Sequence, residues 1–253
     1  MRSVVIPARN EAGTIGRVVE HCEADEVLVI DASTDDTGAI AQRAGAQVYR
    51  EEELLPDFGP VLGKGDAMWR ALSAVRGDVV VYVDADTEHF GEHFVHRLAE
   101  PIESGGAQFV KGHYRRPFRL GETVADEGGG RVTELTAKPL LAAFYPELSA
   151  IRQPLAGEVA ATRDLLLRLP FSTGYAVEIA MLIDAWKDVG IDAIAQADLE
   201  VRQNRHQALS ALRPMADAVL AAVSDRLARE GRLAAGPSGL VERPPLASLT
   251  WRR

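Results

Sequence analysis

Gly77-Asp78-Val79-Val80-Val81-Tyr82-Val83-Asp84-Ala85-Asp86 is the stretch that decides the fold. Residues 79–83 are five consecutive β-branched or aromatic side chains, the pattern of a strand buried in a parallel sheet. Asp84 and Asp86 follow at the strand end, where open α/β sheets bind ligands. Carboxylates suit Mg²⁺ or Mn²⁺, which often bind through one or two carboxylates plus substrate phosphates. The stretch predicts a metal–diphosphate site; a strand-end pair that caps a helix or makes a turn is the alternative.

Strands and helices alternate before this stretch. Buried strands are predicted at residues 3–6, 26–30 and 46–49, with helices between them that end near residues 22 and 44. Pro7 is predicted to end the first strand, because proline has no N–H for a central ladder. The alternation predicts βαβ units with right-handed crossovers. No G-x-G-x-x-G follows the first strand, so the dinucleotide-binding fingerprint is absent.

The remainder of the chain continues the pattern with longer helical segments. Helices are predicted at residues 67–75, 89–98, 135–143, 161–169, 174–189 and 215–229, and strands from residue 109 and over 191–201. Pro101 is expected to break the helix before it. We expect the tail from residue 234 to be disordered or packed on a partner subunit.

Composition excludes several classes of protein. The chain has 253 residues, 47% hydrophobic and 26% charged, as an ordinary globular domain does. A formal net charge of −9 argues against nucleic acid or an anionic membrane as partner. One cysteine, Cys22, allows no internal disulfide, and no apolar run reaches membrane-spanning length. The chain enters a predicted strand at once, so we expect no signal peptide and a cytoplasmic location.

Three other stretches carry polar groups that could bind anions or metal. Lys64 lies between two glycines at a predicted helix start and can meet a phosphate with ammonium and backbone N–H groups, unless it marks an ordinary surface turn. Arg131 and Thr133 follow three glycines, which suits a carboxylate or phosphate; the alternative is a disordered loop. His206 follows two arginines just after a predicted strand, although a single histidine is more often structural.

These motifs together resemble a known family. PARNE (7–11), GKGDAMWRAL (63–72), the D-x-D at 84–86, GGGRVTEL (128–135), AGE-x-AATR (156–163) and GYAVEI (174–179) are similar to the glucosyl-3-phosphoglycerate synthases, retaining glycosyltransferases of the GT-A fold with mannosyl-3-phosphoglycerate synthases as close relatives. The resemblance runs from about residue 3 to residue 209. It implies a Rossmann-like, mostly parallel sheet flanked by helices. Residues 1–108 would form the nucleotide-sugar half, 109–232 the acceptor and catalytic half, and 233–253 a tail.

The resemblance also implies a role for each matching residue. The expected donor-binding residues are Pro7, Ala8, Arg9, Glu11, Asp31, Lys64, Asp84, Ala85, Gly157, Glu158 and Tyr175. The expected acceptor-binding residues are Gly130, Arg131, Val132, Thr133 and Asn204. The expected catalytic residues are Glu178, Lys64, Asp86 and Arg202, and the metal ligands are Asp86 and His206.

One departure from the family pattern concerns the metal. Members often carry a histidine two residues after the arginine and an asparagine two further on, whereas this chain has Asn204 and His206. His206 is expected either to reach the metal or to serve the acceptor side. The chain also starts directly at the first strand, without the longer N-terminal extension common in the family.

The expected reaction moves a hexose, with glucose favoured, from a nucleoside-diphosphate sugar such as UDP-glucose to the hydroxyl of 3-phosphoglycerate. Mg²⁺ or Mn²⁺ and Lys64 would neutralise the leaving diphosphate, with front-face attack and Glu178 orienting the sugar. A homodimer is expected from the resemblance. The alternatives are another small acceptor, such as a hydroxy acid or sugar phosphate, a nucleotidyltransferase, or a non-catalytic nucleotide-binding module.

Overall fold

The computed structural model of the protein describes residues 1–115, 118–120, 123–125, 130–201, 209–234 and 241–249. Within these ranges the main sheet has seven strands in the order β10-β5-β8-β4-β1-β2-β3. The strands are β1 (Arg2–Ala8), β2 (Glu26–Asp31), β3 (Gln47–Arg50), β4 (Val79–Tyr82), β5 (Phe109–Arg115), β8 (Val159–Thr162) and β10 (Ile194–Val201). β8 runs antiparallel to both of its neighbours, whereas the remaining pairs are parallel. This confirms the predicted mixed, mostly parallel GT-A sheet.

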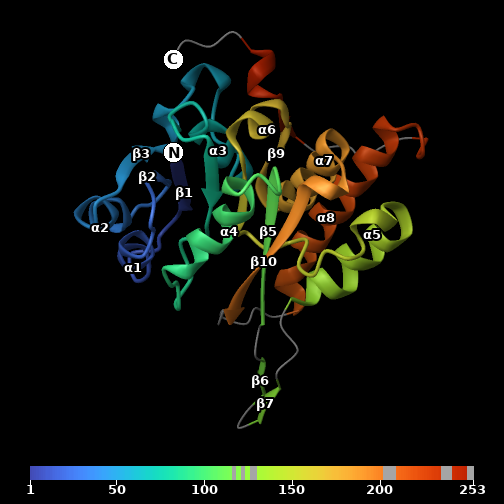
Figure 1. Cartoon of the computed structure of the whole chain (residues 1–253), viewed down its shortest axis with the longest axis horizontal. Coiled ribbons are helices and arrows are strands. Elements are labelled where there is room, and N and C mark those ends of the chain that lie inside the picture. The colour runs from blue at the N-terminus through green and yellow to red at the C-terminus, as the bar shows by residue number, and fades with distance from the viewer. Residues whose placement is uncertain (116–117, 121–122, 126–129, 202–208, 235–240, 250–253) are drawn as a thin grey trace.

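Helices cover both faces of the sheet, as Figure 1 shows. They are α1 (Ile15–Glu20), α2 (Thr37–Arg43), α3 (Lys64–Ala71), α4 (His93–Glu103), α5 (Lys138–Phe144), α6 (Arg163–Arg168), α7 (Val177–Val189) and α8 (Leu209–Arg229). Two short strands, β6 (Phe118–Leu120) and β7 (Thr123–Ala125), pair with each other and project from the body. Two further strands, β9 (Phe171–Ser172) and β11 (Glu242–Arg243), also pair with each other.

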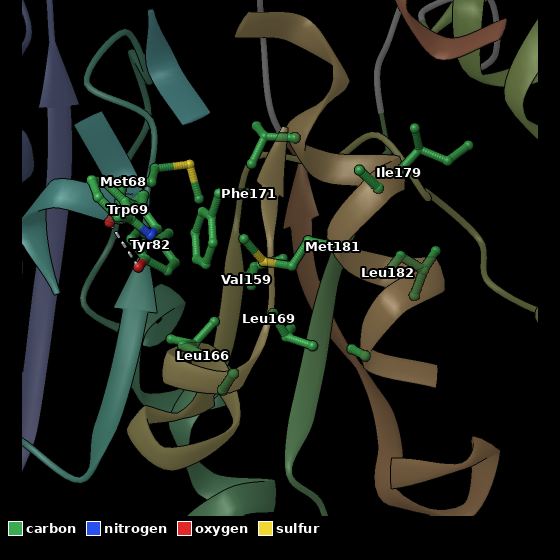
Figure 2. Close-up of a cluster of buried hydrophobic side chains, with 14 of the residues drawn as sticks. Met68, Trp69, Tyr82, Val159, Leu166, Leu169, Phe171, Ile179, Met181 and Leu182 are labelled. Atoms are coloured by element: carbon green, nitrogen blue, oxygen red, sulfur yellow. Dashed lines mark hydrogen bonds between the residues drawn. The ribbon is translucent and has the colours of Figure 1, made fainter. Parts of the chain in front are cut away.

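The two cores follow from the alternation of side chains along the strands. Val80 and Tyr82 of β4 face the core beneath α3, α6, α7 and α8, whereas Val79 and Val81 face the core beneath α1, α2 and α4. Figure 2 shows the first of these cores, with Phe171 between Met68 and Tyr82 on one side and Met181 of α7 on the other. A run that is apolar at every position therefore fits a strand buried on both faces.

Two predictions about proline were wrong. Pro7 lies inside β1, opposite Ile30 of β2. Val5 accepts a hydrogen bond from Val83 on the β4 side, and Ala8 accepts one from Ala32 on the β2 side. Backbone N–H groups point alternately to the two sides of a strand, so the Pro7 nitrogen faces β4. The pairing of β4 with β1 has already ended at Tyr82, so the N–H that proline lacks costs no hydrogen bond of the sheet. Pro101 lies inside α4 in its final turns, and the helix continues to Glu103.

The predicted helix at residues 161–169 is really a strand followed by a helix. Residues 159–162 form β8, and only residues 163–168 are helical. Thr162 caps that helix, accepting a hydrogen bond from the Leu165 amide at its hydroxyl. β8 fills the gap between β4 and β5, so long-range pairing overrides the helical preference of its two alanines.

The end of the chain packs on the same chain, contrary to our expectation for residues 241–249. β11 pairs with β9, and the short 3₁₀ helix η7 (Leu246–Ser248) buries Leu246 completely. Trp69 of α3 donates a hydrogen bond from its indole to the Pro244 carbonyl. Figure 1 shows this C-terminal segment returning to the part of the molecule that carries α3. Among the helices described, none is long and apolar enough to cross a membrane.

Candidate active site

The carboxyl ends of β1 and β2 hold two loops against each other. The Asn10 amide donates to the Ser33 hydroxyl at 2.8 Å, and the Thr34 amide donates to the Asn10 side chain at 2.9 Å. The Glu11 amide donates to the Thr37 hydroxyl at 2.8 Å. Asn10 adopts a left-handed backbone with φ 58°, which asparagine tolerates better than most residues. The segment of residues 7–11, the end of β1 and the loop after it, is thereby fixed beside the end of β4.

Asp31 is buried at the end of β2 and is held from two sides. Its carboxylate accepts hydrogen bonds from the Ser33 amide and from the Arg50 guanidinium, each at 2.9 Å. Arg50 comes from the neighbouring strand β3 and also donates to the Ser33 carbonyl. A buried carboxylate with two donors keeps a fixed orientation. Asp31 therefore lies at the strand end where we expected it, two strands away from Asp84.

Gly63 and Gly65, on either side of Lys64, are each required for a different structural reason. Gly63 has φ 94°, a conformation that residues with a side chain rarely adopt. A Cβ on Gly65 would fall on the carbonyl oxygen of Ser172, because α3 and β9 approach so closely. The pair thus starts α3 sharply and brings its N-terminus against β9. Lys64 is left at the first position of α3, where the helix dipole and free N–H groups favour an anion.

Lys64 joins two carboxylates from distant parts of the chain. Its Nζ donates to Asp84 at 2.6 Å and to Glu178, in the first turn of α7, at 2.8 Å. The side chains of Lys64, Asp84 and Glu178 are 29%, 22% and 13% exposed, so the cluster is open to a ligand on one side. Burial alone would lower the pKa of Lys64, but the two carboxylates outweigh it and hold the pKa above its usual value. Lys64 therefore carries a positive charge at physiological pH.

Gly157 lies against this cluster from the start of β8. A Cβ at this position would overlap both carboxylate oxygens of Asp84, so a side chain here would displace that carboxylate. The next residue, Glu158, is fully buried, and its backbone carbonyl accepts a hydrogen bond from Gly112 of β5. Glu158 therefore lies beneath the site instead of lining its surface.

Asp86 is the exposed carboxylate of the D-x-D, and Ala85 before it is buried. No group of three or more histidine, cysteine, aspartate or glutamate side chains that could hold a metal occurs in the described ranges. A single exposed carboxylate fits a cation that takes its other ligands from a diphosphate and water, as Mg²⁺ and Mn²⁺ commonly do. Arg202, Asn204 and His206 lie outside the described residues.

The predicted acceptor loop is partly exposed at its start. Gly130 and Arg131 are half-buried, whereas Val132 and Thr133 are buried, as the short π-helical turn η3 (Thr133–Ala137) begins. Tyr175, in the 3₁₀ turn η5 (Gly174–Ala176) before α7, is 62% exposed. α8 contacts both η3 and η5 and so joins this loop to the turn that precedes Glu178.

Sequence reasoning missed Lys111 of β5. Its side chain is completely buried, and its Nζ donates to the Ala156 carbonyl at 2.6 Å, next to Gly157. A lysine in the interior of a strand that begins Phe109-Val110 was the available signal, because lysine is almost never fully buried without a partner.

A mixed sheet of this order with a D-x-D at the end of a central strand defines a nucleotide-sugar glycosyltransferase of the GT-A class. The model of the family named Glycosyl transferase family 2 matches residues 3–123. The glucosyl-3-phosphoglycerate synthase of Mycolicibacterium paratuberculosis is 43% identical over 99% of this chain and 85% of that protein. The chain belongs to the glucosyl-3-phosphoglycerate synthase family.

Solved structures agree with this assignment. The mannosyl-3-phosphoglycerate synthase of Rubrobacter xylanophilus matches with a TM-score of 0.89 and 45% identity, covering 99% of this chain and 89% of that one. The glucosyl-3-phosphoglycerate synthase of Mycobacterium tuberculosis, in complex with Mn²⁺, UDP-glucose and phosphoglyceric acid, matches with a TM-score of 0.86 and 43% identity over 98% and 90% of the two chains.

Proposed function

We propose that the protein is a retaining glucosyltransferase that moves glucose from UDP-glucose to the hydroxyl group of 3-phosphoglycerate. The observation that carries this proposal is the Lys64 ammonium held between Asp84 and Glu178 at the carboxyl edge of the sheet. The identities to synthases of this reaction, over nearly the whole chain, support the choice of substrates. Both substrates are intracellular metabolites, so we also infer a cytoplasmic location.

We assign each part of the substrates to residues near the carboxyl ends of the strands. The loop of residues 7–11 and Asp31 would hold the nucleoside, and Lys64 would meet the diphosphate with a permanent positive charge. A divalent cation held by Asp86, with His206 as a second candidate ligand, would supply further charge neutralisation when bound. Arg131 and the N–H groups near Gly130 would take the anionic groups of the acceptor.

Retention of configuration requires attack from the face that the diphosphate leaves. The bond between the sugar C1 and the diphosphate breaks, and the acceptor oxygen forms the new bond to C1. The acceptor proton passes to the departing phosphate. Glu178, held by a hydrogen bond from Lys64, would orient the sugar or stabilise the developing positive charge at C1.

A mannosyl donor is the second candidate. The mannosyl-3-phosphoglycerate synthase of Rubrobacter xylanophilus is as similar to this chain as the glucosyl enzymes are. The two sugars differ in the orientation of one hydroxyl, and one or two pocket contacts decide such a difference, each worth a few kcal/mol.

The test is a matrix of donors and acceptors, followed by release of nucleoside diphosphate. UDP-glucose, GDP-glucose and GDP-mannose are each combined with 3-phosphoglycerate, glycerate or no acceptor, with Mn²⁺, Mg²⁺ or chelator. We expect release with UDP-glucose, 3-phosphoglycerate and metal together, and its loss in Asp86→Ala with the melting temperature retained.

Other outcomes contradict particular parts of the proposal. Metal-dependent hydrolysis of the donor without stimulation by 3-phosphoglycerate would reject the acceptor and keep the transferase. Release of pyrophosphate would indicate a nucleotidyltransferase. Binding of UDP without any turnover would leave a nucleotide-binding module, and full activity of Asp86→Ala would reject the metal role of that residue.

A further inference from the structure

Lys111 is a buried cation that the proposed reaction leaves unexplained. Its side chain has no exposed surface, and its Nζ donates a hydrogen bond to the carbonyl oxygen of Ala156 at 2.6 Å. An ammonium in the protein interior costs several kcal/mol unless hydrogen bonds and opposite charges compensate for its lost hydration. A methionine of similar length would fill the same space without that cost, so packing alone does not explain why a charged residue stands here.

The direction of the side chain supplies the first part of that reason. Phe109 of β5 belongs to the core beneath α3 and α7, and Val110 to the core on the other face. Alternation places Lys111 on the same face as Phe109, under the helices that carry Lys64 and Glu178. The pKa of Lys111 responds to the charges of Glu178 of α7, Lys64 of α3, Glu158 before β8 and Asp84 after β4, so these groups lie within electrostatic range of it.

The strand order supplies the second part. β8 is antiparallel to its neighbours, and its first residue, Val159, pairs with Tyr82 at the end of β4 and with Lys111 within β5. The residues just before β8 therefore lie between the end of β4 and the continuing strand β5, whose Gly112 donates a hydrogen bond to the Glu158 carbonyl. Lys111 holds the Ala156 carbonyl, the following Gly157 lies against the Asp84 carboxylate, and Asp84 accepts the hydrogen bond of Lys64.

We propose that Lys111 is a positioning residue for sugar transfer, which fixes the Ala156–Gly157 backbone against Asp84 and places a second positive charge beneath Lys64. The reaction named here rests on the proposed function. Without Lys111, the cluster of Asp84, Glu178 and Glu158 would lose one of the two lysine charges that act on it. The site would then repel the diphosphate of the donor more strongly and hold Asp84 less firmly.

The charge of Lys111 is within reach of an experiment. Burial lowers the pKa of Lys111 to about 8, although the surrounding carboxylates oppose the shift. Lys111 is therefore protonated below pH 8 and neutral above it, whereas Lys64 keeps its proton over the same range. If the charge matters, kcat/KM for UDP-glucose falls as the pH rises through about 8. A lysine that served only to fill space would produce no such fall of kcat/KM on the alkaline side of the pH profile.

The first measurement compares Lys111→Met with Lys187→Met. Lys187 pairs with Glu230 near the other end of α7, nine residues from Glu178 and so about 13 Å along the helix. We expect Lys111→Met to weaken UDP-glucose binding, measured by calorimetry without acceptor, and to lower kcat/KM for UDP-glucose, each by at least about tenfold or 1.4 kcal/mol. The KM for 3-phosphoglycerate and both properties of Lys187→Met should stay within about twofold.

The second measurement is the pH profile of the unchanged chain and of Lys111→Arg. The unchanged chain should show the alkaline limb, and Lys111→Arg, which stays charged, should lose it. A flat profile of the unchanged chain from pH 7 to 9, or wild-type donor affinity in folded Lys111→Met, would overturn the role of Lys111. Failure of the unchanged chain to use UDP-glucose would instead overturn the proposed function, because that result involves no variant.

Discussion

At the scale of single residues, the charges around Lys64 affect how the site would receive a diphosphate. Asp84 and Glu178 both contact the Lys64 ammonium, so a diphosphate arriving at Lys64 would also meet these two carboxylates. A divalent ion at Asp86 and the Lys111 ammonium would offset their negative charge. The aspartates of the D-x-D would thus serve different purposes, Asp84 as a partner of Lys64 and Asp86 as the exposed ligand.

Gly157→Ala tests the packing of this cluster. The new methyl group would overlap the Asp84 carboxylate, whose oxygens lie 2.4 Å from the added carbon, and would displace it from its 2.6 Å hydrogen bond with Lys64. We expect kcat/KM for UDP-glucose to fall at least about tenfold, and unfolding to cost about 1–3 kcal/mol less, as overpacking usually does.

Gly106→Ala is the matched control for this substitution. Gly106 follows α4, and a Cβ there would meet only ordinary van der Waals contacts, 3.5 Å or more away. Its activity and melting temperature should be those of the unchanged chain. Full activity of Gly157→Ala would show that Asp84 can move without harm, and would remove the reason given for the glycine.

At the scale of helices and strands, local sequence patterns predicted most strands of the sheet but not β8, next to the central strand β4. β1, β2 and β4 were predictable because each is an uninterrupted apolar run. β8 was not, because its sequence Val-Ala-Ala-Thr leads directly into a helix, and only pairing with two distant strands makes it extended.

The same limit applies to the candidate site. Asp84, Asp86 and Lys64 were predictable from strand-end and helix-start chemistry, which is local. That Lys64 contacts Glu178, 114 residues away, was not, since it requires knowing that the first turns of α3 and α7 meet. Lys111 escaped notice for the same reason: its partner Ala156 comes from the loop before β8.

Glu26 ties together the amino ends of three strands, on the edge of the sheet opposite the site. Its buried carboxylate accepts hydrogen bonds from the Ser3 hydroxyl at 2.5 Å, the Arg76 amide at 2.7 Å and the Gly77 amide at 3.3 Å. Burial alone would raise the pKa of Glu26, but these bonds and the Arg76 side chain lower it overall. Glu26 thus joins β1, β2 and the approach to β4 in its charged form.

Glu26→Gln should therefore destabilise the fold in a pH-dependent way. The amide lacks the charge that these donors favour, so we expect a loss of about 1–3 kcal/mol in the free energy of unfolding at pH 7. A lowered pKa gives stability that is present above the unfolded value, about 4.3, and is lost as the pH falls through the folded value. In urea titrations the difference between Glu26→Gln and the unchanged chain should shrink as the pH falls below about 4.

Glu147→Gln is the control for this pH dependence, since Glu147 is exposed in a surface 3₁₀ turn. Its unfolding should follow the unchanged chain within about 0.5 kcal/mol at each pH. A deficit of Glu26→Gln that stayed constant down to pH 3 would mean that packing of the side chain, and not its charge, stabilises this edge.

At the scale of the whole molecule, one sheet unites the two halves that we predicted to divide near residue 108. β1 to β4 form one end of the sheet, and β5, β8 and β10 form the other, with the candidate site at the β4–β8 junction. The C-terminal segment adds a second connection. Glu242 contacts Arg226 and Arg229 of α8, whereas Arg243 reaches Asp66 of α3. Residues 242 and 243 thus link α8 to α3, the helix that starts with Lys64. Association of two copies stays a prediction.

Arg243→Ala tests this connection. The Arg243 guanidinium donates to buried Asp66 at 2.7 Å and to the carbonyl groups of Phe58 and Pro60, so it fastens the loop before α3. Removing one member of a buried ion pair typically costs about 3–5 kcal/mol. Arg70 still contacts Asp66 and would retain part of that energy, so we expect a loss of about 2–3 kcal/mol and a melting temperature lower by roughly 4–12 °C.

The same substitution should lower the affinity for the donor as well as the stability of the fold, because the loop before α3 and α3 itself position Lys64. We expect UDP-glucose to bind several-fold less tightly to Arg243→Ala at 20 °C, where the variant is still folded, with the KM for 3-phosphoglycerate unchanged. Arg213→Ala is the control: Arg213 is an exposed residue of α8 whose contact with Asp217 is 3.7 Å long, so its removal should change stability by less than about 0.5 kcal/mol. Equal melting temperatures of Arg243→Ala and Arg213→Ala would show that the C-terminal segment does not stabilise the fold. The position of Lys64 would then depend on the packing of α3 against β9.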